Sequence, residues 1–483
     1  MKTTYLLLLT INLFANLGCM DNHQATKANT ILTLIQDKDE EQVLSLLSTE
    51  PNLLSLRTNN QSSILHLAAA FLTRNFFVQL KELYAQQLDF TATDKNGNIP
   101  LHLSARSLSS YPETVLFLLE NSNPTARNLE GQTPLHLATK AASTEKVRII
   151  CSFFGYDQQK MQQPDDHGRT PIHYCAFGPR LDYSDIVSIL EKNHSEQPCR
   201  PIACKDSMGQ TVVHLAAVQH RKKLLELTTT QNSPLLEQKD AEGKTPLACF
   251  LSSKPEKYDN TVFLALLDRG AYTYQTDTNE NTMFHHAALA GRIQQFELLT
   301  TRKVNPNKKN KLGQTALMYY VAHAKDIDTK IIAELRRYGA EITTTDNNGN
   351  TLCHIGAEKR DLPLINFCAC QHMDFNIKNN EGKTPLAVLL ASPEQEKDDE
   401  LYSALIYSNA EIDAVDNKGN TLLHHAAAHA KNIIVEKLLK AGLKATTTNN
   451  AGETALALCT NSETKSILDP QLDDWQILST PET

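Results

Sequence analysis

The chain has 483 residues, and its 47 Lys and Arg residues against 55 Asp and Glu residues give a formal net charge of −8. Hydrophobic residues make up 41% and charged residues 21%, which are near the averages of globular domains. A modest negative charge favours solubility and lacks the basic footprint of nucleic-acid binding, so we expect no nucleic-acid partner.

The N-terminus carries an export pattern. Lys2 precedes a largely apolar run, 5–17, that is too short for a permanent membrane span and is typical of a secretory signal. The string ANLGCMDN puts small residues before Cys19 and resembles a bacterial lipoprotein signal, although Asn16 stands where an aliphatic residue is usual. We predict a signal peptide at 1–19 with a lipid on Cys19; the alternative is a signal in which this cysteine has no role. No later stretch is apolar over membrane length, so such a lipid would be the only membrane attachment.

After a predicted linker at 20–28, the chain repeats one pattern every 33 to 41 residues. Twelve anchors open a TPLH-like tetrapeptide and define repeats 1 to 12: Ser63, Ile99, Thr133, Thr170, Thr211, Thr245, Thr282, Thr315, Thr351, Thr384, Thr421 and Thr454. Because one short repeat cannot bury its own apolar face, twelve copies indicate a stacked solenoid rather than three globular domains.

Each repeat is predicted to form two helices. The anchor Thr is a good helix N-cap, the Pro after it suits the first helical position, and small residues such as 68–70 follow. A second amphipathic stretch, such as 433–442, ends at a Gly suited to the left-handed C-terminal position, as at Gly270, Gly339 and Gly442.

The loop before each anchor carries a glycine two residues upstream. Ten of the 18 glycines occupy this position: Gly97, Gly131, Gly168, Gly209, Gly243, Gly313, Gly349, Gly382, Gly419 and Gly452. A glycine repeated there predicts a positive φ, and an Asp or Asn three residues earlier favours the turn through side-chain hydrogen bonds. Gln61 and Glu280 replace the glycine in two repeats, where we expect different turns.

The pattern D-x-x-G-x-T-P-L-H-x-A, matched letter for letter by TPLHLA at 133–138, resembles the ankyrin repeat. The resemblance implies an all-α solenoid of about 12–13 helix–turn–helix repeats with β-turn fingers, covering 58–468. The segment 29–57 then becomes a divergent N-terminal capping repeat and 469–483 a C-terminal tail. Trp475 in that tail would contact the cap, or would serve as a docking peptide.

The resemblance also gives a role to the histidine of the tetrapeptide. It implies that the ring hydrogen-bonds to backbone near the loop and ties neighbouring repeats together. This histidine occurs as His66, His102, His136, His173, His214, His285, His354 and His424.

A longer period lies within the short one from Thr211 onward. Repeats with the histidine alternate with repeats that carry Ala or Met there, so equivalent anchors recur every 69 to 71 residues. The extra residues of the second type, at 252–260, 322–329 and 391–400, are predicted to form solvated loops. They are either harmless insertions or a row of protrusions that contact a partner.

We find no pattern for catalysis, a cofactor or a metal. His285 and His424 are explained by the repeat, and Cys368 and Cys370 are two apart, a spacing that does not share a helix face. GxSxG, phosphate-binding, HExxH and kinase signatures are lacking. Cys199 and Cys204 flank the four residues 200–203 within the longest spacer, and an exported chain would favour a disulfide between them.

These observations favour a non-enzymatic, monomeric scaffold that binds a protein partner. Its concave surface and fingertips would display varied side chains on a pre-ordered frame. The predicted contact residues are Lys95, Asn96, Leu129, Glu130, Asp166, His167, Ser207, Met208, Lys311, Leu312, Asn380, Glu381, Asn417 and Lys418. The alternatives are a host-directed bacterial effector on the same scaffold, an enzyme with a site between repeats, and a self-assembling envelope protein.

Overall fold

The structure is a computed structural model that describes residues 22–192, 200–253 and 260–469. Cys19, Cys199 and Trp475 lie outside these residues, so the lipid, the disulfide and the cap contact stay predictions. The described residues form two compact units. Unit 1 contains the residues up to Phe250 together with 260–272, and unit 2 contains 251–253 and the residues from Thr273 onward.

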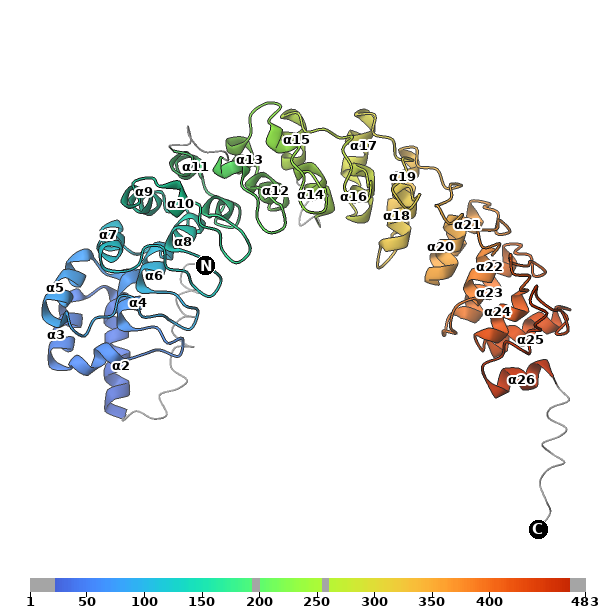
Figure 1. Cartoon of the computed structure of the whole chain (residues 1–483), viewed down its shortest axis with the longest axis horizontal. Helices are drawn as coiled ribbons and strands as arrows, with labels where there is room; N and C mark the ends of the chain where they lie inside the picture. Colours follow the sequence, from blue (N-terminus) through green and yellow to red (C-terminus); the bar gives the residue numbers. More distant parts are fainter. Residues whose placement is uncertain (1–21, 193–199, 254–259, 470–483) are drawn as a thin grey trace, which may run out of the picture. The chain divides into compact units, whose positions relative to one another are not determined.

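Unit 1 consists of two rows of short helices, with a 3₁₀ helix in the place of one first helix (Figure 1). The first helices are α4 (Ile64–Phe71), α6 (Pro100–Arg106), α8 (Pro134–Lys140), η2 (Pro171–Ala176), α12 (Val212–Val218) and α14 (Pro246–Ser252), which reaches the unit boundary. The second helices are α5 (Arg74–Tyr84), α7 (Pro112–Asn121), α9 (Thr144–Phe153), α11 (Ser184–Leu190), α13 (Lys222–Thr228) and α15 (Thr261–Asp268). Short turns α10 (Gln158–Met161), η3 (Pro201–Ala203) and η4 (Pro234–Leu236) lie between a second helix and the next finger.

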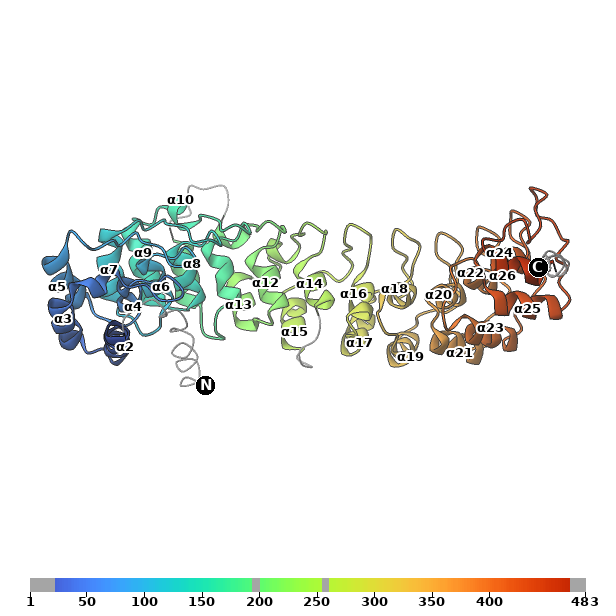
Figure 2. The same ribbon diagram turned by 90° about the horizontal axis from the view of Figure 1, so that it is seen from below.

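Unit 2 repeats this arrangement, and its finger loops project to one side of the helices (Figure 2). The first helices are α16 (Met283–Leu289), α18 (Ala316–His323), α20 (Leu352–Lys359), α22 (Pro385–Leu390) and α24 (Leu422–Ala428). The second helices are α17 (Gln294–Thr301), α19 (Thr329–Arg337), α21 (Leu362–Cys370), α23 (Asp398–Tyr407), α25 (Asn432–Lys440) and α26 (Ser462–Leu468).

The stacking follows from the small and apolar residues of the first helices. Within each unit, first helices pack against neighbouring first helices, as α4 does on α6 and α20 on α22. Ala68 and Ala69 are fully buried, and their short side chains allow the helices to approach closely. Besides helices and turns, the described residues contain only isolated bridges, such as Arg57 with Ser63 across a finger. The predicted all-α repeat architecture is therefore confirmed.

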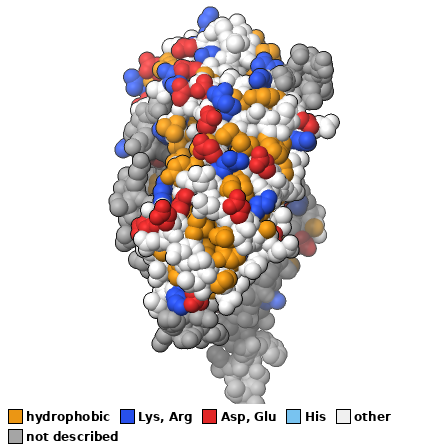
Figure 3. All heavy atoms as spheres, turned by 90° about the vertical axis from the view of Figure 1, so that its left-hand side faces the viewer, with side chains coloured by type: hydrophobic (Ala, Val, Ile, Leu, Met, Phe, Trp, Pro, Cys, Tyr) orange, Lys and Arg blue, Asp and Glu red, His pale blue; other side chains and the backbone are white. Residues whose placement is uncertain are grey.

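The first described helices form one more pair before repeat 1. Helix α2 (Asn22–Asp37) packs on α3 (Glu40–Thr49) and on α4, and a 3₁₀ turn, η1 (Pro51–Ser55), leads to the first finger. The predicted linker at 20–28 is wrong from Asn22 onward, because those residues are already helical. Figure 3, which faces this end of unit 1, shows hydrophobic side chains in small patches separated by charged ones.

The ten finger glycines all have φ between 72° and 80°, the left-handed conformation that the sequence predicted. Gln61 and Glu280 adopt it too, with φ of 57° and 61°, so the expectation of different turns there is wrong. Hydrogen bonds to the next finger keep these two turns in shape: Lys95 N–H donates to the Asn60 carbonyl at 2.7 Å, and Lys311 N–H to that of Asn279 at 3.0 Å.

Basic side chains join repeats across the helix layers, which the sequence did not reveal. Lys146 of repeat 3 donates to the Ser104 carbonyl of repeat 2 at 2.7 Å, and Arg221 of repeat 5 to the Ala176 carbonyl of repeat 4 at 3.1 Å. In unit 2, Lys359 of repeat 9 donates to the Val321 carbonyl of repeat 8 at 2.8 Å. Carbonyls that helix ends and longer loops leave without intrahelical partners are thus satisfied by cations from the next repeat.

The predicted insertion at 391–400 is mostly exposed, but it holds one buried carboxylate. Asp398, 2% exposed, accepts from Arg360 Nε at 2.6 Å and forms an ion pair with the fully buried Lys431. This loop of repeat 10 is therefore attached to repeats 9 and 11 rather than being a plain solvated insertion.

Candidate partner-binding site

The fingertips form a continuous ladder of backbone hydrogen bonds within each unit. We call the two residues directly before each finger glycine the first and second fingertip residues. The N–H of the first fingertip residue donates to the carbonyl of the second fingertip residue in the preceding finger. Leu129 thus donates to Asn96 at 2.9 Å in unit 1, and Asn380 to Asn348 at 2.9 Å in unit 2. The fingers are therefore held in a row at regular spacing.

Each finger is also closed by its first polar residue, as predicted. The Oδ1 of Asp94 accepts from the N–H groups of Asn96 and Asn98 at 2.8 and 2.9 Å. Asn379 closes its finger in the same way, accepting from Glu381 and Lys383 at 3.0 Å each. A side chain that accepts two backbone bonds fixes the turn whether or not a partner is present.

In the eight repeats that carry it, the tetrapeptide histidine locks the next finger onto its own helix pair. His136 accepts from Thr133 N–H through Nδ1 at 3.0 Å, and its Nε2 donates to the Arg169 carbonyl of the next finger at 2.9 Å. All eight histidines make both contacts, with Nε2 to carbonyl distances of 2.8 to 3.2 Å. The Thr133 hydroxyl also lies 2.9 Å from Nδ1, so the anchor supports the ring as well as the helix end.

Burial favours the neutral form of the rings whose pKa it lowers. Desolvation lowers the pKa of His102, His136 and His285 to about 4, and it lowers the pKa of His66 and His354 as well. A neutral ring is what the geometry requires, because Nδ1 must keep its lone pair to accept the anchor N–H.

All fourteen predicted contact residues are exposed on the fingers. Their side chains differ in how they are used. Asn380 and Asn417 are structural, because each Nδ2 donates at 2.8 Å to the carbonyl of the first fingertip residue one finger earlier. In unit 2 the asparagines Asn347, Asn380, Asn417 and Asn450 make this bond in succession. The sequence hypothesis that these positions vary for recognition therefore does not suit the asparagines.

Some charged fingertip side chains also have a partner within the chain, because they form ion pairs. Asp166 accepts from Arg127 at 2.8 Å, and Glu381 pairs with Lys383 at 2.7 Å. The apolar fingertips stand out instead, because Leu129, Leu312 and Met208 are 73%, 58% and 51% exposed. Exposed large apolar side chains on a rigid frame are the better candidates for contact with a partner.

A groove of about 980 Å³ lies between fingers and first helices in unit 1. Leu129 and Asn96 form its finger wall, while Leu108, 77% exposed, and the basic residues Arg106 and Lys140 belong to the helix side. Its full lining is Asn96, Asn98, Arg106, Leu108, Asn128, Leu129, Glu130, Gln132, Leu137, Lys140, Ala141 and Pro179. Sequence reasoning found the finger wall but missed Leu108, Arg106 and Lys140, which lie outside the fingertip positions.

None of the described helices combines the length and apolar character that a membrane span needs.

Comparison with known proteins agrees with this geometry. Residues 108–201 match the family model for ankyrin repeats in three copies. Human inversin is 29% identical over 231 residues, 47% of this chain, and the match covers 21% of inversin. The poly [ADP-ribose] polymerase tankyrase of Caenorhabditis elegans is 23% identical over 429 residues, 79% of this chain and 18% of that protein.

The mouse B-cell lymphoma 3 protein homolog is 22% identical over 296 residues, covering 59% of this chain and 56% of that protein. These relatives are eukaryotic and give no support to a bacterial lipoprotein. The chain spans about a fifth of the length of inversin. Residues 108–201 are thus ankyrin repeats, and their fingers, buried histidines and paired helices recur through both units.

Proposed function

We propose that this chain is a non-enzymatic scaffold that binds an extended segment of a partner protein in the unit 1 groove. The observation that carries the proposal is the pair of exposed leucines, Leu108 and Leu129, on the helix and finger sides of one groove. Large apolar side chains in a hollow rimmed by polar groups are typical of a binding surface.

The charged residues of the groove predict a second property of the partner segment. Arg106 and Lys140 line the helix side, and Glu130 is the acidic residue of the lining. Its carboxylate already lies within hydrogen-bond distance of Gln132. A segment with an apolar side chain next to an acidic one would therefore match the groove.

The ladder and the histidine bonds support this proposal through preorganisation. Finger backbone that is already hydrogen-bonded loses little conformational freedom when a partner binds. The side-chain bonds of Asn128 to Asn98 at 3.0 Å and of Gln132 to Tyr174 at 2.9 Å fix the finger stems beside the groove.

The test is quantitative affinity capture from native lysate with the tagged chain, followed by mass spectrometry. We expect a variant with Leu108→Ala and Leu129→Ala to lose most of a specific partner, because exposed anchors dominate interface energy. Ile433→Ala is the matched control, since that side chain is 56% exposed on α25 of unit 2. Equal recovery of every partner by both variants, with unchanged circular dichroism, would sink the proposal.

Where the scaffold acts is a separate proposal. The apolar run at 5–17 and the position of Cys19 support export with a lipid anchor, within residues that the structure does not describe. Intact-mass measurement of the mature protein tests it: a chain that begins at an acylated Cys19 supports the anchor, and an unprocessed Met1 contradicts it.

A further inference from the structure

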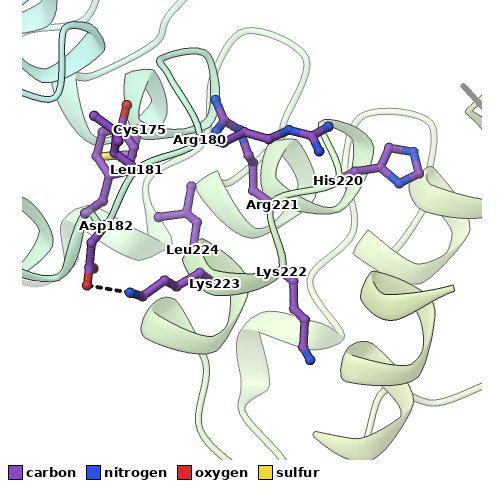
Figure 4. Close-up of a pocket in the computed structure, with 10 residues that line it drawn as sticks. Cys175, Arg180, Leu181, Asp182, His220, Arg221, Lys222, Lys223 and Leu224 are labelled. Atoms are coloured by element: carbon purple, nitrogen blue, oxygen red, sulfur yellow. Dashed lines mark hydrogen bonds and ion pairs between the residues drawn. The ribbon is translucent and has the colours of Figure 1, made fainter. Parts of the chain in front are cut away.

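A second hollow, of about 400 Å³, lies between repeats 4 and 5 of unit 1 (Figure 4). It is formed by the turn after η2 and by the start of α13, away from the fingers. Its lining is Cys175, Arg180, Leu181, Asp182, Tyr183, His220, Arg221, Lys222, Lys223 and Leu224. None of the predicted contact residues belongs to it.

This hollow is strongly basic in a chain that is acidic as a whole. Arginine and lysine supply four of the lining residues, and Asp182 is the single carboxylate among them. Lys223 is directed at Asp182, 2.5 Å away, while Lys222 extends away and lies 3.7 Å from Glu226 (Figure 4). Among the described residues, the two arginines are therefore the cations of this lining that form no ion pair with a carboxylate.

Arg221 is held in place by backbone. Its Nε donates to the Ala176 carbonyl at 3.1 Å, and its Nη2 donates to the Gly178 carbonyl. Burial lowers the pKa of Arg221, and the positive charge of Arg180 lowers it further. Arg180 and Arg221 line the same hollow, and two guanidinium groups placed in this way gain stability when an anion binds between them.

Tyr183 adds a donor. Its side chain is buried, with 2% of its surface exposed, and its hydroxyl has no hydrogen-bond partner among the described residues. A buried hydroxyl without an acceptor is unfavourable, and proteins usually avoid it. An oxygen atom of a bound anion would supply the missing acceptor.

We propose that this hollow binds a phosphate-class oxyanion between the Arg180 and Arg221 guanidinium groups, with the Tyr183 hydroxyl as a further donor. Guanidinium groups bind phosphate oxygens in paired, charge-assisted hydrogen bonds, which suits them better than a single carboxylate oxygen. The site is independent of the groove, so either proposal can fail without the other. The phosphate can be free or carried on a side chain of another protein.

Isothermal titration of the full chain with sodium phosphate, against sodium chloride at equal ionic strength, tests the site. We expect saturable binding that Arg180→Gln weakens about tenfold, the effect of losing one charge-assisted contact. Tyr183→Phe should weaken it about fivefold without lowering the melting temperature of the unbound chain, because the hydroxyl has no partner to lose. Arg302→Gln, at an exposed position that lines neither hollow, is the control and should leave phosphate binding unchanged.

Binding that survives both Arg180→Gln and Tyr183→Phe overturns the proposal, as does the lack of any saturable heat in the parent chain. Competition by a phosphoserine peptide then separates the two sources. Displacement of phosphate by the peptide, and not by its unphosphorylated form, assigns the site to a modified protein. Binding of inorganic phosphate without such competition assigns it to a free phosphate.

Discussion

The Nε2 atom of His136 donates to the carbonyl oxygen of Arg169, 2.9 Å away and one repeat further along the chain. Each such bond couples the protonation of a buried ring to the contact between two repeats. The pKa of His102, His136 and His285 is lowered to about 4 by burial.

We therefore predict that stability falls in mild acid. In the unfolded chain these three histidines take up protons near pH 6.5, whereas in the folded chain they stay neutral down to about pH 4. The free energy of unfolding should thus fall as the pH drops from 6.5 to 4, by up to about 1.4 kcal/mol per pH unit for each of these rings. Urea unfolding at pH 7 and pH 5 measures this difference. Equal midpoints at the two pH values would show that the rings are not buried as neutral groups.

A single histidine can be tested against a matched one. His136→Ala removes the bonds to Thr133 and Arg169 and should cost about 1–3 kcal/mol, while also making stability less dependent on pH. His167→Ala is the control, because that ring is exposed on a fingertip. Urea unfolding of both variants gives the comparison, and equal losses would contradict the repeat-joining role.

Two finger glycines allow the energetic cost of backbone strain to be measured apart from the cost of a packing clash. Gly349 and Gly452 both have φ of 76°, so an added Cβ costs each turn about 1 kcal/mol in strain. At Gly349 that Cβ would lie 2.7 Å from Asn380 Oδ1, whereas at Gly452 it would meet nothing within 4 Å. We expect Gly349→Ala to lower the melting temperature more than Gly452→Ala. The same shift in both would mean that the asparagine ladder adds nothing.

The buried ion pair in unit 2 should be costly to break. Lys431→Met leaves Asp398 buried with Arg360 as its remaining cation, and we expect a loss of about 3 kcal/mol. Lys440→Met, at an exposed position of α25, should change stability by less than about 0.5 kcal/mol. Chemical denaturation of the two variants checks the difference, and a silent Lys431→Met would show that the pair is replaceable.

Local sequence preferences predicted the fold because the same residue signals recur from repeat to repeat. The anchor Thr, the Pro after it and the finger Gly each specify a conformation within a few residues, so helix pairs and fingers could be placed from sequence alone. The contact of Lys431 with Asp398, 33 residues apart, could not, since neither residue belongs to the repeated pattern. The start of α2 at Asn22 was missed for a related reason: its first turns are polar and resemble a linker.

The candidate site was predicted in part. Finger positions follow from the glycine, so Leu129 was placed correctly on an exposed tip. Leu108 belongs to the turn after a first helix, where the sequence varies, and only folding brings it to the same groove. The role of Asn417 was not visible either, because its partner is the carbonyl of Asn380, a group that every residue possesses.

Unit 2 alternates two kinds of joint. Asn310 donates to Asn281 at 2.8 Å, and Asn379 to Asn350 at 2.9 Å, in each case from an even-numbered repeat to the odd one before it. Lys359 reaches back from an odd repeat to the loop of an even one. Deleting one repeat would place two odd-numbered or two even-numbered repeats next to each other. The asparagine amides and the lysine ammonium group would then face a repeat that lacks their hydrogen-bond acceptors. Removing two restores every match, so relatives of this chain should differ in length by multiples of about seventy residues, the spacing of equivalent anchors.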